Sequence, residues 1–390
     1  MRRGTGWSVA AIVATLIVTA CSSSSKASPP TATTAGPTTT TLPAGPAPFA
    51  KTGPYSVGFT TLHLTGGRRV VVWYPAAAAT ITGHARESID VASMLSPALQ
   101  AKVPASDRVL YLANAYQDAP AQTTPGDYPL VVFSHGFAGF PEQSVSLTTH
   151  LASWGFVVAA PDHVERSLDG LLGTATQGVP KQTDVQVLQA TLDLVEHAST
   201  TTGVLHGMVD PSRVVAAGHS AGAGAAYAFA SADARVKAWI SYSVGFGGDG
   251  GPAPAAPDKP GMVMLGTTDG IIPPASSRAV YAGMHTPKYL VQIADAGHLV
   301  FSDICLIGRT KGGIVGIAEA IKLPIPPSLL KLGSDGCTSN HPKPELAFPA
   351  IDQLSVAFFR SALHIDAQPI GLDTAAVAGL GAAVTVTNQG

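Results

Sequence analysis

The sequence predicts an α/β fold in which a mostly parallel central sheet carries helices on both faces. Short apolar runs of strand type, such as residues 130–133, alternate along the chain with stretches whose apolar residues recur at helical spacing. The chain is also 46% hydrophobic but only 12% charged, which is typical of a well-buried domain. This composition argues against nucleic-acid binding, which needs a basic face, and the formal net charge of −2 says little about partners.

The first twenty residues read as an export signal. Arg2 and Arg3 form a positive start, and the apolar stretch at 7–20 is too short to span a bilayer. The run Val-Thr-Ala-Cys that ends at Cys21 looks like a bacterial lipobox, in which the cysteine becomes the lipidated first residue. We therefore expect an exported protein, lipid-anchored to the outer face of the cell membrane. Ordinary signal cleavage beside a chance cysteine stays open.

The remaining chain divides by composition. Residues 21–52 are almost entirely Ser, Thr, Pro, Ala and Gly, which cannot bury enough apolar surface to fold, so we expect a disordered tether. Residues 53–365 form the predicted domain, within which 310–345 is an insertion and a candidate lid. Residues 366–390 are expected to be a C-terminal tail.

The alternation of strands and helices can be placed along most of the domain, although residues 80–127 show only a helix near 91–102. In a parallel sheet, functional groups collect at the carboxyl ends of the strands. The predicted strands cover residues 56–65, 69–75, 130–133, 156–160, 213–217, 236–242, 262–265 and 289–293. The predicted helices cover residues 142–154, 184–197, 275–284 and 351–363.

A glycine-flanked serine follows the strand at 213–217. Gly218-His219-Ser220-Ala221-Gly222 fits the pattern G-x-S-x-G, in which a sharp strand-to-helix turn exposes the serine. Side chains two residues before and after the serine would collide where strand and helix meet, so both positions are glycine. A small-residue helix follows the pattern, as this turn requires. We predict Ser220 as a nucleophile.

A serine hydroxyl needs a histidine to take its proton and a carboxylate to orient that histidine. In this type of fold the chain order is serine, acid, histidine. Asp269 follows the strand at 262–265, and His298 follows the strand at 289–293, so both are expected at the edge that carries Ser220. Asp295 and Asp249 remain rival acids. A helix-capping role for Asp269 and a surface-loop role for His298 are the non-catalytic alternatives.

Three further histidines lie near the predicted site in the sequence motifs. They are His135, His163 and His219, and none of them follows the acid in chain order. We therefore expect each to have a structural or pocket-lining role.

The charge that develops on the substrate oxygen needs two fixed N–H donors. One is expected from the backbone of Ala221, the residue after the nucleophile. The other is expected from the loop at 134–139, where a His-Gly pair lets the backbone approach the substrate and Phe137 is the candidate donor. A generic glycine turn is the alternative for this loop.

On these motifs, residues 53–365 resemble the α/β-hydrolases, in particular an exported actinobacterial group of esterases and lipases. This group is similar to platelet-activating-factor acetylhydrolases, dienelactone hydrolases and cutinase-like polyester hydrolases. The resemblance implies the α/β-hydrolase fold and a carboxylic ester hydrolase that needs no cofactor and no metal. Dienelactone hydrolases have cysteine where this chain has Ser220, which argues against that activity. The matching segments are residues 72–75, 133–137, 161–163, 218–222, 266–269 and 296–298.

The sequence therefore predicts a membrane-tethered serine esterase or lipase that cleaves apolar acyl esters, small-molecule or lipid. Acyl transfer to an envelope lipid by the same triad and lipid binding without catalysis are the alternatives. If Cys21 carries lipid, Cys305 and Cys337 are the remaining pair for a disulfide, and two free thiols are the alternative. The apolar stretch at 314–323 lies within that loop. We expect it either beside the catalytic mouth or on the flank of the domain.

Overall fold

The computed structural model describes residue 42 and residues 45–173, 178–247, 253–323 and 325–390. The predicted signal peptide, Cys21, most of the tether and the rival acid Asp249 lie outside the described residues. Within the described ranges, no helix combines the length and the apolar character that crossing a membrane would require.

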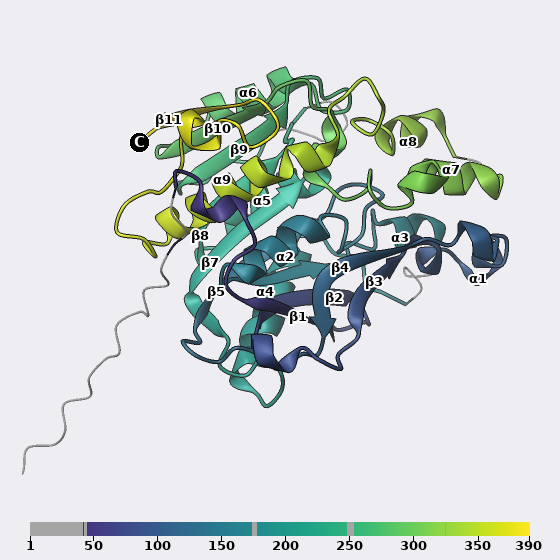
Figure 1. The fold of residues 1–390 in the computed structure, drawn as a ribbon, viewed down its shortest axis with the longest axis horizontal. Helices are drawn as coiled ribbons and strands as arrows, with labels where there is room; N and C mark the ends of the chain where they lie inside the picture. The colour runs from purple at the N-terminus through teal and green to yellow at the C-terminus, as the bar shows by residue number, and fades with distance from the viewer. Residues whose placement is uncertain (1–41, 43–44, 174–177, 248–252, 324) are drawn as a thin grey trace, which may run out of the picture. The chain divides into compact units, whose positions relative to one another are not determined.

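An eleven-stranded sheet forms the centre of the fold (Figure 1). The strand order is β11-β10-β9-β8-β7-β5-β6-β2-β1-β4-β3, and the six strands from β10 to β6 run parallel. This topology confirms the prediction of an α/β-hydrolase fold. The strands are β1 (Ser56–His63), β2 (Arg69–Ala76), β3 (Arg86–Asp90), β4 (Leu110–Gln117), β5 (Tyr128–Ser134), β6 (Val157–Pro161), β7 (Val209–His219), β8 (Val236–Tyr242), β9 (Gly261–Gly266), β10 (Lys288–Ile293) and β11 (Val384–Gln389).

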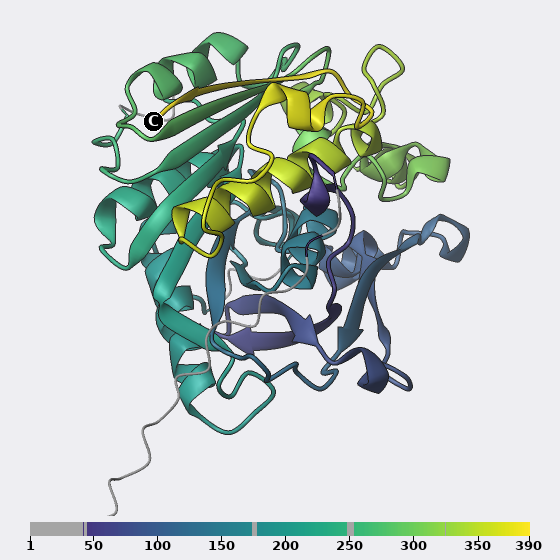
Figure 2. The same cartoon turned by 60° about the vertical axis from the view of Figure 1, so that its left-hand side comes forward.

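Helices cover both faces of this sheet (Figure 2). The packing of their apolar residues divides the core into two layers, with α4, α5 and α6 on one face and α2 and α9 on the other. The α-helices are α1 (Pro97–Gln100), α2 (Val145–Ser153), α3 (Leu168–Leu172), α4 (Asp184–Thr200), α5 (Ala221–Ala232), α6 (Pro274–Ala282), α7 (Gly313–Ala320), α8 (Pro327–Leu332), α9 (Phe348–Ala362) and α10 (Thr374–Val377).

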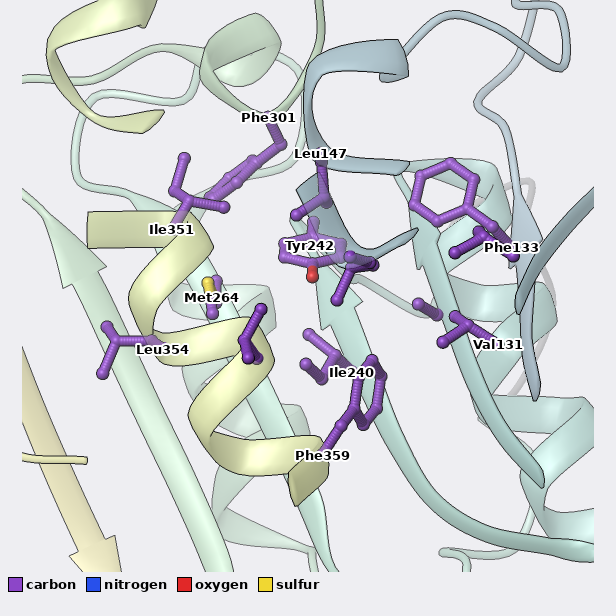
Figure 3. Close-up of a cluster of buried hydrophobic side chains, with 14 of the residues drawn as sticks. Val131, Phe133, Leu147, Ile240, Tyr242, Met264, Phe301, Ile351, Leu354 and Phe359 are labelled. Atoms are coloured by element: carbon purple, nitrogen blue, oxygen red, sulfur yellow. The ribbon is translucent and has the colours of Figure 1, made fainter. Parts of the chain in front are cut away.

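The side chains of each central strand alternate between the two layers. On β8, Ile240 and Tyr242 point toward α9, where Leu354 and Phe359 meet them (Figure 3). Trp239, the residue before Ile240, packs in the other layer. Because both faces are buried from Ala238 to Tyr242, this part of the strand is apolar except for the buried Ser241, rather than alternating with exposed polar residues. The central strands are therefore fixed in register, and so are the loops at their carboxyl ends.

Residues 80–127 contain more structure than the sequence indicated. They form β4 and the edge strand β3, which pair antiparallel. The single helix expected at 91–102 is instead a short 3-10 helix at Val91–Met94 followed by α1. Pro97 separates the two, because the residue before a proline is disfavoured in helical conformation and a proline suits the first turn of a new helix.

The packed domain extends beyond its predicted sequence boundaries at both ends. Residues 366–390 are not only a tail, because β11 pairs antiparallel with β10 over six residues and covers that edge of the sheet. At the other end, Phe49 is fully buried and packs edge-on against Trp154, so the packed part begins before residue 53. The backbone N–H of Phe49 also donates to the side chain of Gln353 on α9.

The insertion at 310–345 carries α7 and α8. Ile317 on α7 packs against Ala92, Leu95 and Val103, so the insertion contacts a segment about two hundred residues earlier in the chain. The predicted disulfide between Cys305 and Cys337 is present, with a sequence separation of 32 residues. The insertion is therefore held both by apolar contacts and by a covalent bond.

Candidate active site

Ser220 lies at the turn from β7 into α5 in a backbone conformation that L-residues rarely adopt, with φ 59° and ψ −121°. The turn is packed too tightly for side chains on either flank. A Cβ on Gly218 would lie 2.1 Å from the carbonyl oxygen of Gly222, and a Cβ on Gly222 would lie 2.0 Å from that of Ser134. The two glycines are thus a steric requirement of the turn, as the sequence pattern indicated.

The structure brings the three predicted residues Ser220, His298 and Asp269 together. The Ser220 hydroxyl lies 2.8 Å from His298 Nε2, and His298 Nδ1 lies 2.8 Å from Asp269 Oδ2. His298 is fully buried, while Ser220 and Asp269 are nearly so. Each comes from a different loop after a parallel strand, namely β7, β9 and β10. A proton can therefore pass from serine to histidine while the carboxylate orients the ring.

The environment of Asp269 favours its ionised form. Its Oδ1 accepts hydrogen bonds from the backbone N–H groups of Ile271 and Ile272 at 2.9 and 2.8 Å. Burial raises the pKa of this carboxyl, but the hydrogen bond and charge of His298 and the two backbone bonds outweigh burial. The pKa of Asp269 therefore lies below its usual value, and the carboxylate can stabilise a charged imidazole.

The rival acid Asp295 is placed differently. It is exposed and has a positive φ of 56°. Its backbone N–H donates to Thr267 Oγ1 at 2.9 Å, and its carbonyl oxygen lies 3.1 Å from His341 Nδ1. It is Asp269, not Asp295, that contacts the ring of His298.

The two predicted oxyanion donors flank the serine. Phe137 and Ser220 both line one cavity, and Ala221 directly follows Ser220. Within the described part of the chain, neither the N–H of Phe137 nor that of Ala221 donates to a protein acceptor. The loop around Phe137 is itself fixed, because the N–H of Ala138 donates to the carbonyl of Arg166 at 2.7 Å. Both donors are thus available to a substrate oxygen.

Gln143 joins the parts of this site and was not found from the sequence. Its Oε1 accepts from the N–H of Gly136 at 2.9 Å, and its Nε2 donates to His219 Nδ1 at 3.0 Å. His219 Nε2 in turn donates to the carbonyl oxygen of His298 at 3.0 Å. Burial, together with the nearby His298, lowers the pKa of His219 to about 3, so this ring is a neutral connector. Nothing in the local pattern around Gln143 signals this role.

The other two histidines lie behind the oxyanion loop and not in the cavity wall. His135 Nε2 accepts from the backbone N–H of His163, and His163 Nε2 lies 2.9 Å from the hydroxyl of Ser134. Arg166 donates to this hydroxyl at 2.9 Å and to the carbonyl of Gly136 at 2.9 Å. Burial, with Arg166 nearby, lowers the pKa of His163 to about 3. These residues support the loop, as expected for a structural role.

An apolar cavity of about 110 Å³ opens at the serine. Its floor is formed by the site residues, and its remaining walls come from α3 and from the insertion. An engineered apolar cavity of roughly 150 Å³ in another protein holds benzene, so a short acyl chain has room here. Over the described ranges, no group of three His, Cys, Asp or Glu side chains is placed to hold a metal ion. The insertion contributes Ile314, Val315, Ile325, Pro326, Leu329 and Leu330 to the wall.

Comparisons with known proteins find similarity to ester hydrolases. Residues 49–183 match the family model of platelet-activating factor acetylhydrolase, isoform II, and residues 118–260 match that of chlorophyllase. The structure is similar to that of a ferulic acid esterase from Streptomyces cinnamoneus, with a TM-score of 0.57 and 22% identity. The match covers 86% of this chain and 97% of that one. Two esterase family models thus match overlapping parts of the chain, and the fold is that of a solved esterase. The prediction of an ester-hydrolysing enzyme is confirmed at this level.

Asp269→Asn tests the choice of acid. The amide would favour the wrong tautomer of His298, so we expect turnover of a p-nitrophenyl ester to fall by roughly 10⁴-fold. Asp295→Asn is the matched control and should stay within about threefold of the unmodified enzyme, because Asp295 does not contact the ring. A dead Asp295→Asn beside a near-normal Asp269→Asn would reverse the assignment.

Proposed function

We propose that this esterase-like hydrolase is a serine carboxylic ester hydrolase that acts on apolar acyl esters through an acyl-enzyme on Ser220. The observation that supports the proposal most directly is the continuous hydrogen-bonded chain from Ser220 through His298 to Asp269. Its serine end lines an apolar cavity. A serine in this arrangement is activated for attack on an acyl carbon.

In the first half of the reaction, the Ser220 oxygen attacks the ester carbonyl while His298 Nε2 takes the serine proton. The N–H groups of Phe137 and Ala221 bind the oxyanion of the tetrahedral intermediate. The ester C–O bond then breaks, and His298 returns the proton to the leaving alcohol. The acyl group remains on Ser220.

In the second half, a water molecule gives a proton to His298 and attacks the acyl-enzyme. The second tetrahedral intermediate uses the same two N–H donors. It collapses to the free acid, and His298 returns the proton to the Ser220 oxygen. Asp269 stays ionised throughout and stabilises the imidazolium that forms in each half.

The substrate class follows from the cavity walls. The acyl part would lie against aliphatic side chains of α3 and the insertion, where none of the described lining residues carries a charged group. Burying each methylene of a substrate in such a wall contributes about 0.8 kcal/mol. The comparisons support ester cleavage, since the matched names include an acetylhydrolase and a ferulic acid esterase.

We also propose that the enzyme is exported and held at the outer face of the cell membrane by lipid on Cys21. The supporting observation is the N-terminal sequence, whose positive start and short apolar run precede that cysteine. Cys21→Ala should then release activity from the membrane fraction when the full chain is expressed in a bacterium, while the unmodified chain stays membrane-bound. Equal membrane retention of both would overturn the lipid anchor.

Ser220→Ala should abolish hydrolysis, with a loss on the order of a millionfold in turnover, because the nucleophile is removed. The unmodified enzyme should be labelled at Ser220 by a fluorophosphonate probe, and the variant should not. Mass spectrometry of the labelled peptide is the measurement. Labelling at another residue, or none in the unmodified enzyme, would contradict the acyl-enzyme mechanism.

Leu329→Trp tests the acyl-binding wall. The larger ring would fill part of the cavity, so kcat/KM for p-nitrophenyl octanoate should fall about tenfold or more relative to the acetate. Leu346→Trp is the control, because Leu346 is exposed and does not line the cavity. An unchanged ratio of octanoate to acetate hydrolysis in Leu329→Trp would place the acyl chain elsewhere.

A further inference from the structure

The insertion also reaches the backbone of the two loops that carry the acid and the histidine. Asp335 Oδ1 accepts a hydrogen bond from the backbone N–H of His298 at 2.6 Å. The same oxygen lies 3.4 Å from the backbone nitrogen of Gly270, the residue after Asp269. One carboxylate oxygen thus contacts the main chain of both loops.

Two more contacts join the same segments. The carbonyl oxygen of Asp335 accepts from the N–H of Leu299 at 3.0 Å, so Asp335 holds two successive residues of the histidine loop. Lys331 Nζ donates to the carbonyl of Gly270 at 2.6 Å, so the insertion contacts both the N–H and the carbonyl of this residue of the acid loop.

The backbones approach each other closely enough to exclude side chains. A Cβ on Gly297 would lie 2.6 Å from Gly336 Cα, and a Cβ on Gly270 would lie 2.5 Å from Asp335 Oδ2. Gly336 has a positive φ of 93°, which suits glycine. The next residue, Cys337, is bonded to Cys305, which follows the histidine loop. The position of Asp335 is therefore fixed by packing and by the disulfide.

We propose that Asp335 is a positioning residue that sets the distance between His298 and Asp269. The inference rests on the proposed function. The ring of His298 can accept the serine proton only while its Nδ1 lies within hydrogen-bond reach of Asp269. Thr267 and Thr268 already join the two loops near the strand ends. Asp335 joins them further along, at His298 itself and at the residue after Asp269. A displacement of about 1 Å in such a group can lower turnover about 100-fold.

Variants of Asp335 can separate the effect of its hydrogen-bond acceptor from the effect of its negative charge. Asp335→Asn keeps an oxygen that accepts both N–H groups, and in the described part of the chain Oδ2 makes no hydrogen bond that the amide would lose. Asp335→Ala removes the acceptor. Asp335→Glu keeps the charge but moves the carboxylate by one methylene, away from its place between the loops.

The experiment compares these variants with the unmodified chain on p-nitrophenyl acetate, well below each melting temperature. We expect Asp335→Ala to lower kcat about 100-fold with KM changed less than about threefold, and the rate of fluorophosphonate labelling at Ser220 to fall in parallel. Asp335→Asn should restore kcat to within about threefold, and Asp335→Glu should remain impaired. Glu319→Ala, an exposed acid of α7, is the control and should be normal.

Equal kcat in Asp335→Ala and the unmodified chain would overturn the inference, as would a loss confined to KM. If Asp335→Ala does not fold, the comparison of the other two variants decides. Asp335→Glu as active as Asp335→Asn would show that the place of the acceptor does not matter, and an impaired Asp335→Asn beside an active Asp335→Glu would show that charge matters instead; either result overturns the inference. An unmodified chain that the fluorophosphonate does not label would instead contradict the proposed function. Normal labelling of every variant would leave that function intact and reject the role of Asp335.

Discussion

The close contact between the Ser220 turn and the end of β5 is the constraint on which the site depends. Gly222 lies so near the carbonyl of Ser134 that no side chain fits between them. This contact fixes the distance between the serine and the loop that carries Phe137, and so the distance between nucleophile and oxyanion donors. The unfavourable φ of Ser220 is maintained because the sheet and α5 are buried on both sides, which makes any relaxed turn sterically inaccessible.

Buried polar groups then connect the loops that the strands bring together. Gln143 and the neutral ring of His219 link the oxyanion loop to the carbonyl of His298, and Arg166 supports the same loop from behind. An unpaired polar group in such a place would cost about 1–3 kcal/mol. Because their hydrogen bonds are made, these buried groups hold the loops in one arrangement. Preorganised oxyanion donors and a fixed histidine require such rigidity.

The sequence predicted the parts of the molecule that depend on local pattern. The strand at 236–242 and the steric reason for the two glycines follow from neighbouring residues. The choice of Asp269 and His298 follows from the chain order expected for this type of fold and from the strands that precede them. Gln143 and Asp335 could not be predicted, since their partners lie far away in sequence and no spacing marks them. The strand β11 did carry a signal, because Val384 and Val386 alternate with polar residues, but its distance from the other strands hid its partner.

The insertion has two parts with unequal freedom to change. Its first part, α7 and the residues up to α8, meets the rest of the protein through interchangeable aliphatic contacts, such as that of Ile317 with Leu95. Its last part, residues 331–337, meets the His298 loop backbone to backbone and the Asp269 loop through the side chains of Lys331 and Asp335, at glycines where even a methyl group does not fit. Enzymes descended from a common ancestor with this architecture could thus diversify their acyl preference by varying the first part in length and sequence. The same variation in residues 331–337 would displace the loops of Asp269 and His298 and so lower the rate of the reaction.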